Sequence, residues 1–237
     1  MQTKSSYPWL MLISRSVVFI TLQALIALAF FLAGDASAWS ESARWWTFVA
    51  ALANILSILL LIYLYKAEDK KFRDSFRFTR ASVKTDLLWF VGSGVIGLPI
   101  AALPMYVLGT AIFGDRMIPV NMMFLPLPSW ALVVSLIFPL TIAFAELPTY
   151  FGYVMPRLSR QMNSWLAWLV ASFFLGAQHM FLPFLPDGRF MLWRLLMYMP
   201  FALFAGLLIK LRPSLLPYFM IVHALVDLSA VSVYLMI

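Results

Sequence analysis

Residues 140–158 read LTIAFAELPTYFGYVMPRL, an apolar stretch with one carboxylate, Glu146, ahead of Arg157. A bilayer is crossed by about 20 mostly apolar residues, so this stretch predicts a transmembrane helix. An ionisable side chain at membrane depth costs roughly 2.5–3.5 kcal/mol on insertion scales and therefore tends to mark a functional site. Pro148 predicts a kink in this helix, two residues after the glutamate.

The composition extends this assignment to the whole chain. Hydrophobic residues make up 63% of the 237 residues, charged residues 11%, and the mean hydropathy is +0.91. A soluble domain is only about 45–50% apolar. The sequence contains no cysteine, which excludes disulfides, thiolate nucleophiles and cysteine metal sites.

We therefore predict an all-α fold, a polytopic bundle of about seven transmembrane helices. The expected domains are an N-terminal three-helix membrane region, 1–129, and a core, 130–237. The first contains a basic loop, 66–86, which fits an amphipathic helix on the inner leaflet or a solvated loop. The predicted spans are 16–34, 45–65, 87–112, 130–155, 164–183, 190–209 and 214–236.

The basic residues predict the orientation. A cytoplasmic N-terminus places 13 of them inside and four outside, so the positive-inside rule favours this topology with the C-terminus outside, in a bacterial plasma membrane. The inner set is Lys4, Arg15, seven residues from Lys66 to Lys84, Arg157, Arg160, Lys210 and Arg212; the outer set is Arg44, Arg116, Arg189 and Arg194. Since seven basic residues cluster beside a span, we expect the lipid bilayer as a partner, and no nucleic acid.

The first span has a second interpretation. Ala36-Ser37-Ala38 resembles a signal-peptide cleavage site. The apolar run before it is longer than the usual core of about 7–15 residues, which favours an uncleaved helix.

The two histidines of the chain also lie in apolar stretches. His223 and Asp227 are four residues apart and share one face of a helix, as a structural hydrogen-bonded pair or as part of a site. His179 fits either an interfacial ring or a functional group, and Gln178 beside it fits a bond to neighbouring backbone. We expect Arg194, near the outer end of its span, to extend to the interface.

Glu146, His179, His223 and Asp227 form the candidate catalytic set. Together they permit glutamate-assisted attack of water on an amide, with imidazoles that position the water or stabilise the oxyanion. Two histidines and a carboxylate can also hold a divalent metal such as zinc, although no HExxH motif is present and we assign no metal ligand.

A rise of 1.5 Å per residue places Glu146 about 16 Å from Arg157 but His179 about 24 Å from Asn163. A shared site therefore requires helix tilt, a kinked fourth span or a later start of the fifth helix. It also requires His179 to lie within about 8 Å of Glu146.

These residues resemble the CAAX-protease and bacteriocin-processing (Abi) family of intramembrane proteases over about residues 130–235. That family carries EExxxRG, then LLLPRL-like residues, then FxxxH, then HxxxN or HxxxD. The alignment rests on Gly152 and on residues 155–158, which read MPRL. It matches Glu146, His179, His223 and Asp227 to the first glutamate, the second-motif histidine and the third motif.

The resemblance implies an intramembrane endopeptidase with a four-helix catalytic core, in which Glu146 and His179 activate water. His223 and Asp227 would stabilise the oxyanion. Because an ionised carboxylate repels an oxyanion, Asp227 would either orient His223 or be protonated itself. The sequence departs from the motifs at Leu147, Phe151 and Leu175, where the family has glutamate, arginine and an aromatic residue.

Two alternatives to a protease remain open at this point. The lost glutamate and arginine are compatible with a non-catalytic binding protein or a bacteriocin self-immunity protein. The ionisable groups in the membrane are also compatible with a proton-coupled transporter, although no repeated halves are evident.

Overall fold

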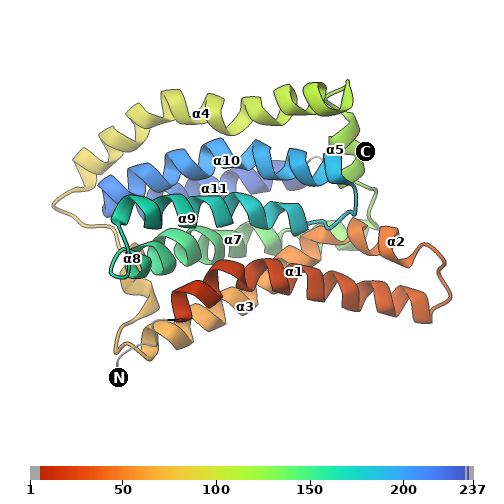
Figure 1. The fold of residues 1–237 in the computed structure, drawn as a ribbon, viewed down its shortest axis with the longest axis horizontal. Helices are drawn as coiled ribbons and strands as arrows, with labels where there is room; N and C mark the ends of the chain where they lie inside the picture. Colours follow the sequence, from red (N-terminus) through yellow and green to blue (C-terminus); the bar gives the residue numbers. More distant parts are fainter. Residues whose placement is uncertain (1–5, 233, 235–237) are drawn as a thin grey trace.

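The computed structural model describes residues 6–232 and 234, and this part of the chain is built from helices without strands (Figure 1). Six helical segments in it are long and apolar enough to cross a membrane. The predicted all-α membrane bundle is thereby confirmed. The six are α1 (Tyr7–Leu32), α3 (Trp46–Lys66), α4 (Val83–Phe113), the composite segment Ser129–Leu158, α10 (Gly188–Leu211) and Pro213–Ser232, which contains α11 (Leu216–Ser232).

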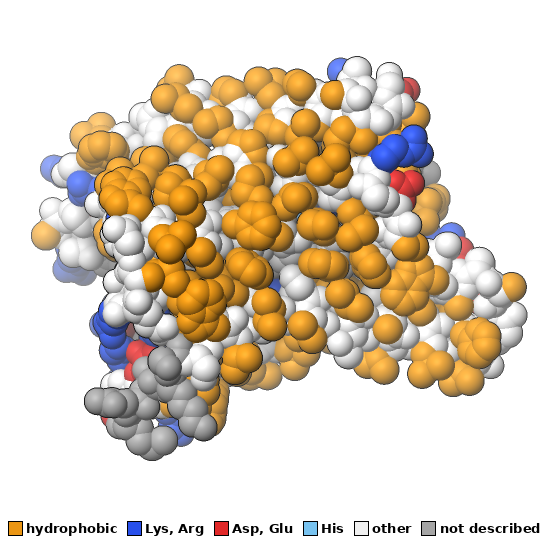
Figure 2. All heavy atoms as spheres, viewed as in Figure 1, with side chains coloured by type: hydrophobic (Ala, Val, Ile, Leu, Met, Phe, Trp, Pro, Cys, Tyr) orange, Lys and Arg blue, Asp and Glu red, His pale blue; other side chains and the backbone are white. Residues whose placement is uncertain are grey.

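The surface of the bundle is that of an integral membrane protein. Hydrophobic side chains cover its flank, whereas most of the visible charged side chains gather toward its two ends (Figure 2). Large apolar side chains that would be buried in a soluble protein stand free on α4, where Leu88 is 74% and Val95 77% exposed. Such a surface is stable in lipid and unfavourable in water.

The fifth predicted span, 164–183, consists of two pieces. The helix α9 (Ser164–Ala177) has 14 residues and continues directly into a 3-10 turn, η3 (Gln178–Phe181). Asn163 caps the start of α9, and Asp187 caps α10 after the connecting loop. The helices α9 and α10 pack antiparallel (Figure 1). The start of α1 and the end of α11 lie at opposite ends of the bundle.

The composite segment changes its helical type beside Glu146. It comprises α6 (Ser129–Ser135), α7 (Ile137–Leu147), a π-helical stretch η2 (Pro148–Val154) and α8 (Met155–Leu158). Pro148 lacks the N–H that would continue the α-helical hydrogen bonds, so the irregularity predicted there takes the form of a π segment. Such segments are frequently found at functional sites.

The basic loop is mostly irregular, with a five-residue 3-10 helix, η1 (Phe72–Phe76), in place of a long amphipathic helix. Its phenylalanines fasten it to the bundle. Phe72 and Phe76 contact Tyr65 and Phe144 at ring-centroid distances of 5.8 and 5.7 Å. Of the two predicted alternatives, the solvated loop agrees better with the structure than the amphipathic helix. The loop is nevertheless anchored to the bundle by aromatic contacts.

Ion pairs join the segments at this end of the bundle. Glu68 accepts hydrogen bonds from Nε and Nη2 of Arg157 at 2.5 and 2.6 Å, and Asp86 pairs with Arg212. These pairs join the loop after α3 to α8, and the start of α4 to the end of α10. The basic residues Arg157 and Arg212, both predicted to be cytoplasmic, therefore lie at the same end of the molecule as the basic loop. Burial alone would raise the pKa of Glu68, but hydrogen bonds and charge from Arg157 and Lys70 outweigh it and hold this pKa below its usual value.

Polar side chains form a layer between the two apolar clusters of the core. Along α1, for example, Leu12 belongs to one cluster and Phe19 to the other, and Arg15 lies between them. On α3 and α11 polar residues likewise lie between members of the two clusters, and Glu146 on α7 and Gln178 and His179 on η3 contact these polar residues or one another. We call this set the polar layer: Arg15, Asn54, Ser57, Glu146, Gln178, His179, His223 and Asp227.

Replacement of Glu68 by glutamine should lower the stability of the protein at neutral pH by about 2–3 kcal/mol, because Arg157 loses a charge-assisted pair. The measurement is thermal unfolding in detergent as a function of pH. The pKa of Glu68 is lower in the folded state than in the unfolded state. The difference in the free energy of unfolding between the wild type and Glu68→Gln therefore has its full size above about pH 4.3. It should vanish as the pH falls through the folded-state pKa.

The matched control is Glu41→Gln, because Glu41 forms a surface pair with Arg44. It should change stability by less than about 1 kcal/mol. Equal losses in the two variants would contradict an anchoring role for the Glu68–Arg157 pair.

Candidate active site

The site is centred on the carboxylate of Glu146, which is buried on the last turn of α7. Its Oε1 lies 3.2 Å from Nε2 of His223. Its Oε2 lies 3.9 Å from Nε2 of His179 and 3.7 Å from Nη2 of Arg15. Three separate elements, α1, η3 and α11, therefore direct nitrogen atoms at one carboxylate.

His223 lies between two carboxylates. Its Nε2 is 3.1 Å from Oδ2 of Asp227, one helical turn further along α11. The predicted shared face of this pair is confirmed. A proton on Nε2 of His223 can therefore be directed to either Glu146 or Asp227.

The backbone determines the tautomer of His179. Its Nδ1 lies 2.9 Å from the carbonyl oxygen of Leu175. Because a carbonyl only accepts, Nδ1 carries the hydrogen, and in the neutral ring Nε2 is left with a lone pair facing Glu146. The ring stacks on Tyr198 with a centroid distance of 3.8 Å and an interplanar angle of 23°.

The candidate catalytic residues are brought together. The 3.9 Å between Glu146 and His179 is well inside the required limit of about 8 Å. A later start of the fifth helix is not the explanation, because α9 begins at Ser164 as predicted. The irregular helix expected in the fourth span is present at Pro148.

Arg194 was expected to extend to the interface, and this prediction is wrong. Its side chain is 1% exposed and points into the protein. It donates to the carbonyl oxygens of His179 and Leu182 and to the hydroxyl of Tyr198. The loop after η3 offers carbonyls without helical partners, and a guanidinium can satisfy several of them at once. Arg194 thus holds the backbone of His179 and the ring stacked on it.

Arg15 is the residue that the sequence interpretation missed. It was counted among the cytoplasmic basic residues, and the first span was drawn from residue 16. In the structure α1 begins at Tyr7, and Arg15 is 1% exposed within it. The span includes Arg15 because the arginine has partners inside the bundle.

Those partners are polar residues of the neighbouring spans. Arg15 donates from Nε to Gln178 at 2.7 Å, from Nη1 to Ser57 at 3.1 Å and from Nη2 to Asn54 at 3.0 Å. Gln178 also accepts from the hydroxyl of Tyr150, so its expected bond to neighbouring backbone is replaced by side-chain bonds. A usable signal was present in the sequence, since Asn54 and Gln178 are also polar residues inside apolar runs.

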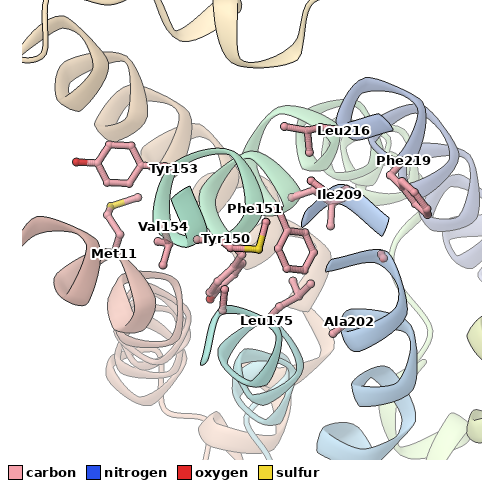
Figure 3. Packing of buried hydrophobic residues seen from close by; sticks show 14 of the residues in the cluster. Met11, Tyr150, Phe151, Tyr153, Val154, Leu175, Ala202, Ile209, Leu216 and Phe219 are labelled. Carbon is pink, nitrogen blue, oxygen red and sulfur yellow. The ribbon is translucent and has the colours of Figure 1, made fainter. Parts of the chain in front are cut away.

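The two charged positions missing from the first motif are part of the apolar core. Leu147 and Phe151 are 0% and 2% exposed. Phe151 lies in the packed cluster with Leu175 and Ala202 (Figure 3). A methyl group added at Gly206 would come within 2.7 Å of the Phe151 ring, so α10 is closely packed at this position.

The polar layer does not fit the zinc version of the sequence hypothesis. No group of three or more acidic or histidine side chains among residues 6–232 and 234 has an arrangement that could hold a metal ion. His223 already faces two carboxylates, and the guanidinium of Arg15 beside Glu146 would repel a dication. We therefore derive no step through a metal.

A family model described as type II CAAX prenyl endopeptidase Rce1-like matches residues 128–229. The resemblance to CAAX-type proteases is confirmed. The Rce1-like segment, residues 128–229, contains Glu146, both histidines and Asp227, whereas Arg15 lies outside it. No curated protein and no solved structure matches the chain. The Rce1-like match supports a protease-type enzyme within a membrane.

Replacement of Arg194 by lysine should destabilise the protein by about 1–3 kcal/mol, although the charge is retained. Lysine carries its donors on one atom, so it does not reproduce the three separate guanidinium nitrogens that reach His179, Leu182 and Tyr198. Thermal unfolding in detergent measures this loss. Arg189→Lys is the control, because the Arg189 side chain is 67% exposed and should tolerate the change. Unchanged stability of the Arg194 variant would show that Arg194 does not hold this loop.

Proposed function

We propose that the protein is an intramembrane endopeptidase that hydrolyses a peptide bond of a peptide or membrane-protein substrate with water activated by Glu146 and His179. One observation carries the proposal: a single buried glutamate has the Nε2 atoms of two histidines facing its two oxygens. The Rce1-like match supports the same reaction class.

The space between Glu146 and His179 suits the attacking water. Their facing atoms are 3.9 Å apart, too long for a direct hydrogen bond and close to the separation that a bridging water spans. Such a water donates one hydrogen to Oε2 of Glu146 and the other to the lone pair on Nε2 of His179. Its oxygen is then free to attack a carbonyl carbon, and Glu146 takes up the proton.

His223 is suited to stabilise the tetrahedral intermediate. A hydrogen on its Nε2 can be donated to the oxyanion that forms as water adds to the carbonyl. In the resting site Oδ2 of Asp227, 3.1 Å from the same Nε2, holds this hydrogen and orients the ring. The hydrogen turns from Asp227 to the oxyanion as the oxyanion forms. The C–N bond then breaks, the carbonyl re-forms, and the proton held by Glu146 passes to the leaving amine.

We further propose a bacterial plasma membrane location with the N-terminus cytoplasmic and the C-terminus outside. Arg15 and Arg194 are buried and do not report on the topology. Without them, 12 basic residues lie on the inner side and three on the outer side. The bias in charge therefore persists. The name of the matching family makes prenylated CAAX peptides the first substrates to test.

Replacement of Glu146 by glutamine should reduce hydrolysis by about 10³-fold, because an amide cannot accept the proton from water. The assay uses purified protein in liposomes and a quenched fluorescent peptide that ends in a prenylated CAAX sequence, with the unprenylated peptide as a second substrate. A chelator such as EDTA should leave the rate unchanged, since no step is assigned to a metal.

Cleavage by the wild type that persists in Glu146→Gln would contradict the mechanism. Absence of cleavage by the wild type, with substrate binding or bacteriocin protection unchanged in the variant, would favour a non-catalytic protein. Proton flux that the substitution abolishes, without proteolysis, would favour a transporter.

Replacement of Asp227 by asparagine should keep kcat within about tenfold of the wild type, whereas leucine should lower it by about 100-fold or more. The amide oxygen of asparagine can still accept from His223, and leucine offers no acceptor. Steady-state hydrolysis of the same peptide measures both variants. Equal inactivation by asparagine and leucine would show that the charge of Asp227, beyond its orienting hydrogen bond, is required.

A further inference from the structure

Arg15 brings a full positive charge to the site from α1, outside the Rce1-like segment. We propose that Arg15 is a positioning residue for the hydrolysis: its guanidinium keeps the Glu146 carboxylate ionised and turns Oε2 toward His179. This inference rests on the proposed function, because it assigns Arg15 a role in that same reaction.

The charges around Glu146 support this role. Arg15 on α1 faces Oε2 at 3.7 Å, and the neutral tautomer of His179 on η3 faces the same oxygen with a lone pair. His223 on α11 faces Oε1 and is shared with Asp227. Because Asp227 adds a second negative charge, Arg15 is the permanent cation that offsets this pair of carboxylates.

The guanidinium is held in place independently of Glu146. Its three nitrogens each donate to a side chain of another segment: Gln178 on η3, and Ser57 and Asn54 on α3. Asn54 in turn donates to Thr141 on α7 at 3.1 Å. These bonds prevent Arg15 from moving fully onto Glu146, so the carboxylate keeps room to bind water.

The local sequence of the glutamate helix makes an outside cation necessary. Leu147 and Phe151, which replace the glutamate and arginine of the family motif, are buried in apolar packing. The segment from α7 to η2 therefore supplies no positive charge near Glu146. A carboxylate buried without a counter-charge would take up a proton and lose its function as a base.

The test compares Arg15→Met, which removes the charge at similar length, with Arg15→Lys, which keeps it. With the liposome assay, Arg15→Met should lower kcat by about 100-fold with little change in KM. The acidic limb of its pH profile should move to higher pH, because protonation of Glu146 no longer competes with a neighbouring cation. Arg15→Lys should keep the wild-type position of that limb and recover part of kcat.

A second measurement does not depend on cleavage or on full stability of the variants. Infrared difference spectra at neutral pH should show a protonated carboxyl band in Arg15→Met that is absent in the wild type, in Arg15→Lys and in the double variant with Glu146→Gln. Arg44→Met is the control for loss of an arginine, because Arg44 forms a surface pair with Glu41, and it should match the wild type throughout.

An unchanged acidic limb in Arg15→Met, or absence of the new carboxyl band, would overturn the role of Arg15 while leaving the protease proposal intact. Failure of the wild type to cleave any test peptide would instead count against the proposed function. The infrared comparison would still decide whether Arg15 keeps Glu146 ionised.

Discussion

A carboxylate buried halfway along a membrane bundle is tolerated only if positive charge and hydrogen-bond donors surround it, and Glu146 imposes this requirement on the other helices. The negative charges of the Glu146 and Asp227 carboxylates can be balanced by the guanidinium of Arg15 and by His223 when both of its ring nitrogens carry a proton. The polar layer is then electrically neutral. Each partner comes from a different segment, and the bundle must bring these segments together in one register.

The apolar clusters on either side of the polar layer make this register unique. A shift of α1 by one turn would carry Arg15 into side chains such as Leu12 or Phe19. The penalty for an unpaired charge there exceeds what any alternative packing could recover. Arg194 acts in a similar way on the other side of the site, since its bonds to the carbonyls of His179 and Leu182 fix where η3 ends.

The sequence was sufficient to predict the features that depend on composition and local spacing. It predicted six apolar spans of the seven expected, the shared face of His223 and Asp227, the irregularity at Pro148 and the resemblance confirmed over residues 128–229. The catalytic roles and the division at residue 129 remain predictions. Arg15 and Arg194 were misplaced because a charge near the end of an apolar run resembles a snorkelling residue, and its partners lie far away in the sequence.

The distances along the chain that separate the parts of the polar layer have a consequence for biosynthesis. Arg15 lies on α1, whereas His223 and Asp227 lie on α11, which the ribosome makes after α1, α7 and η3. A growing chain that has inserted α1, α7 and η3 but not α11 can have Arg15 and His179 beside Glu146 and still lacks His223. The proposed hydrolytic centre can therefore form only after α11 has been inserted.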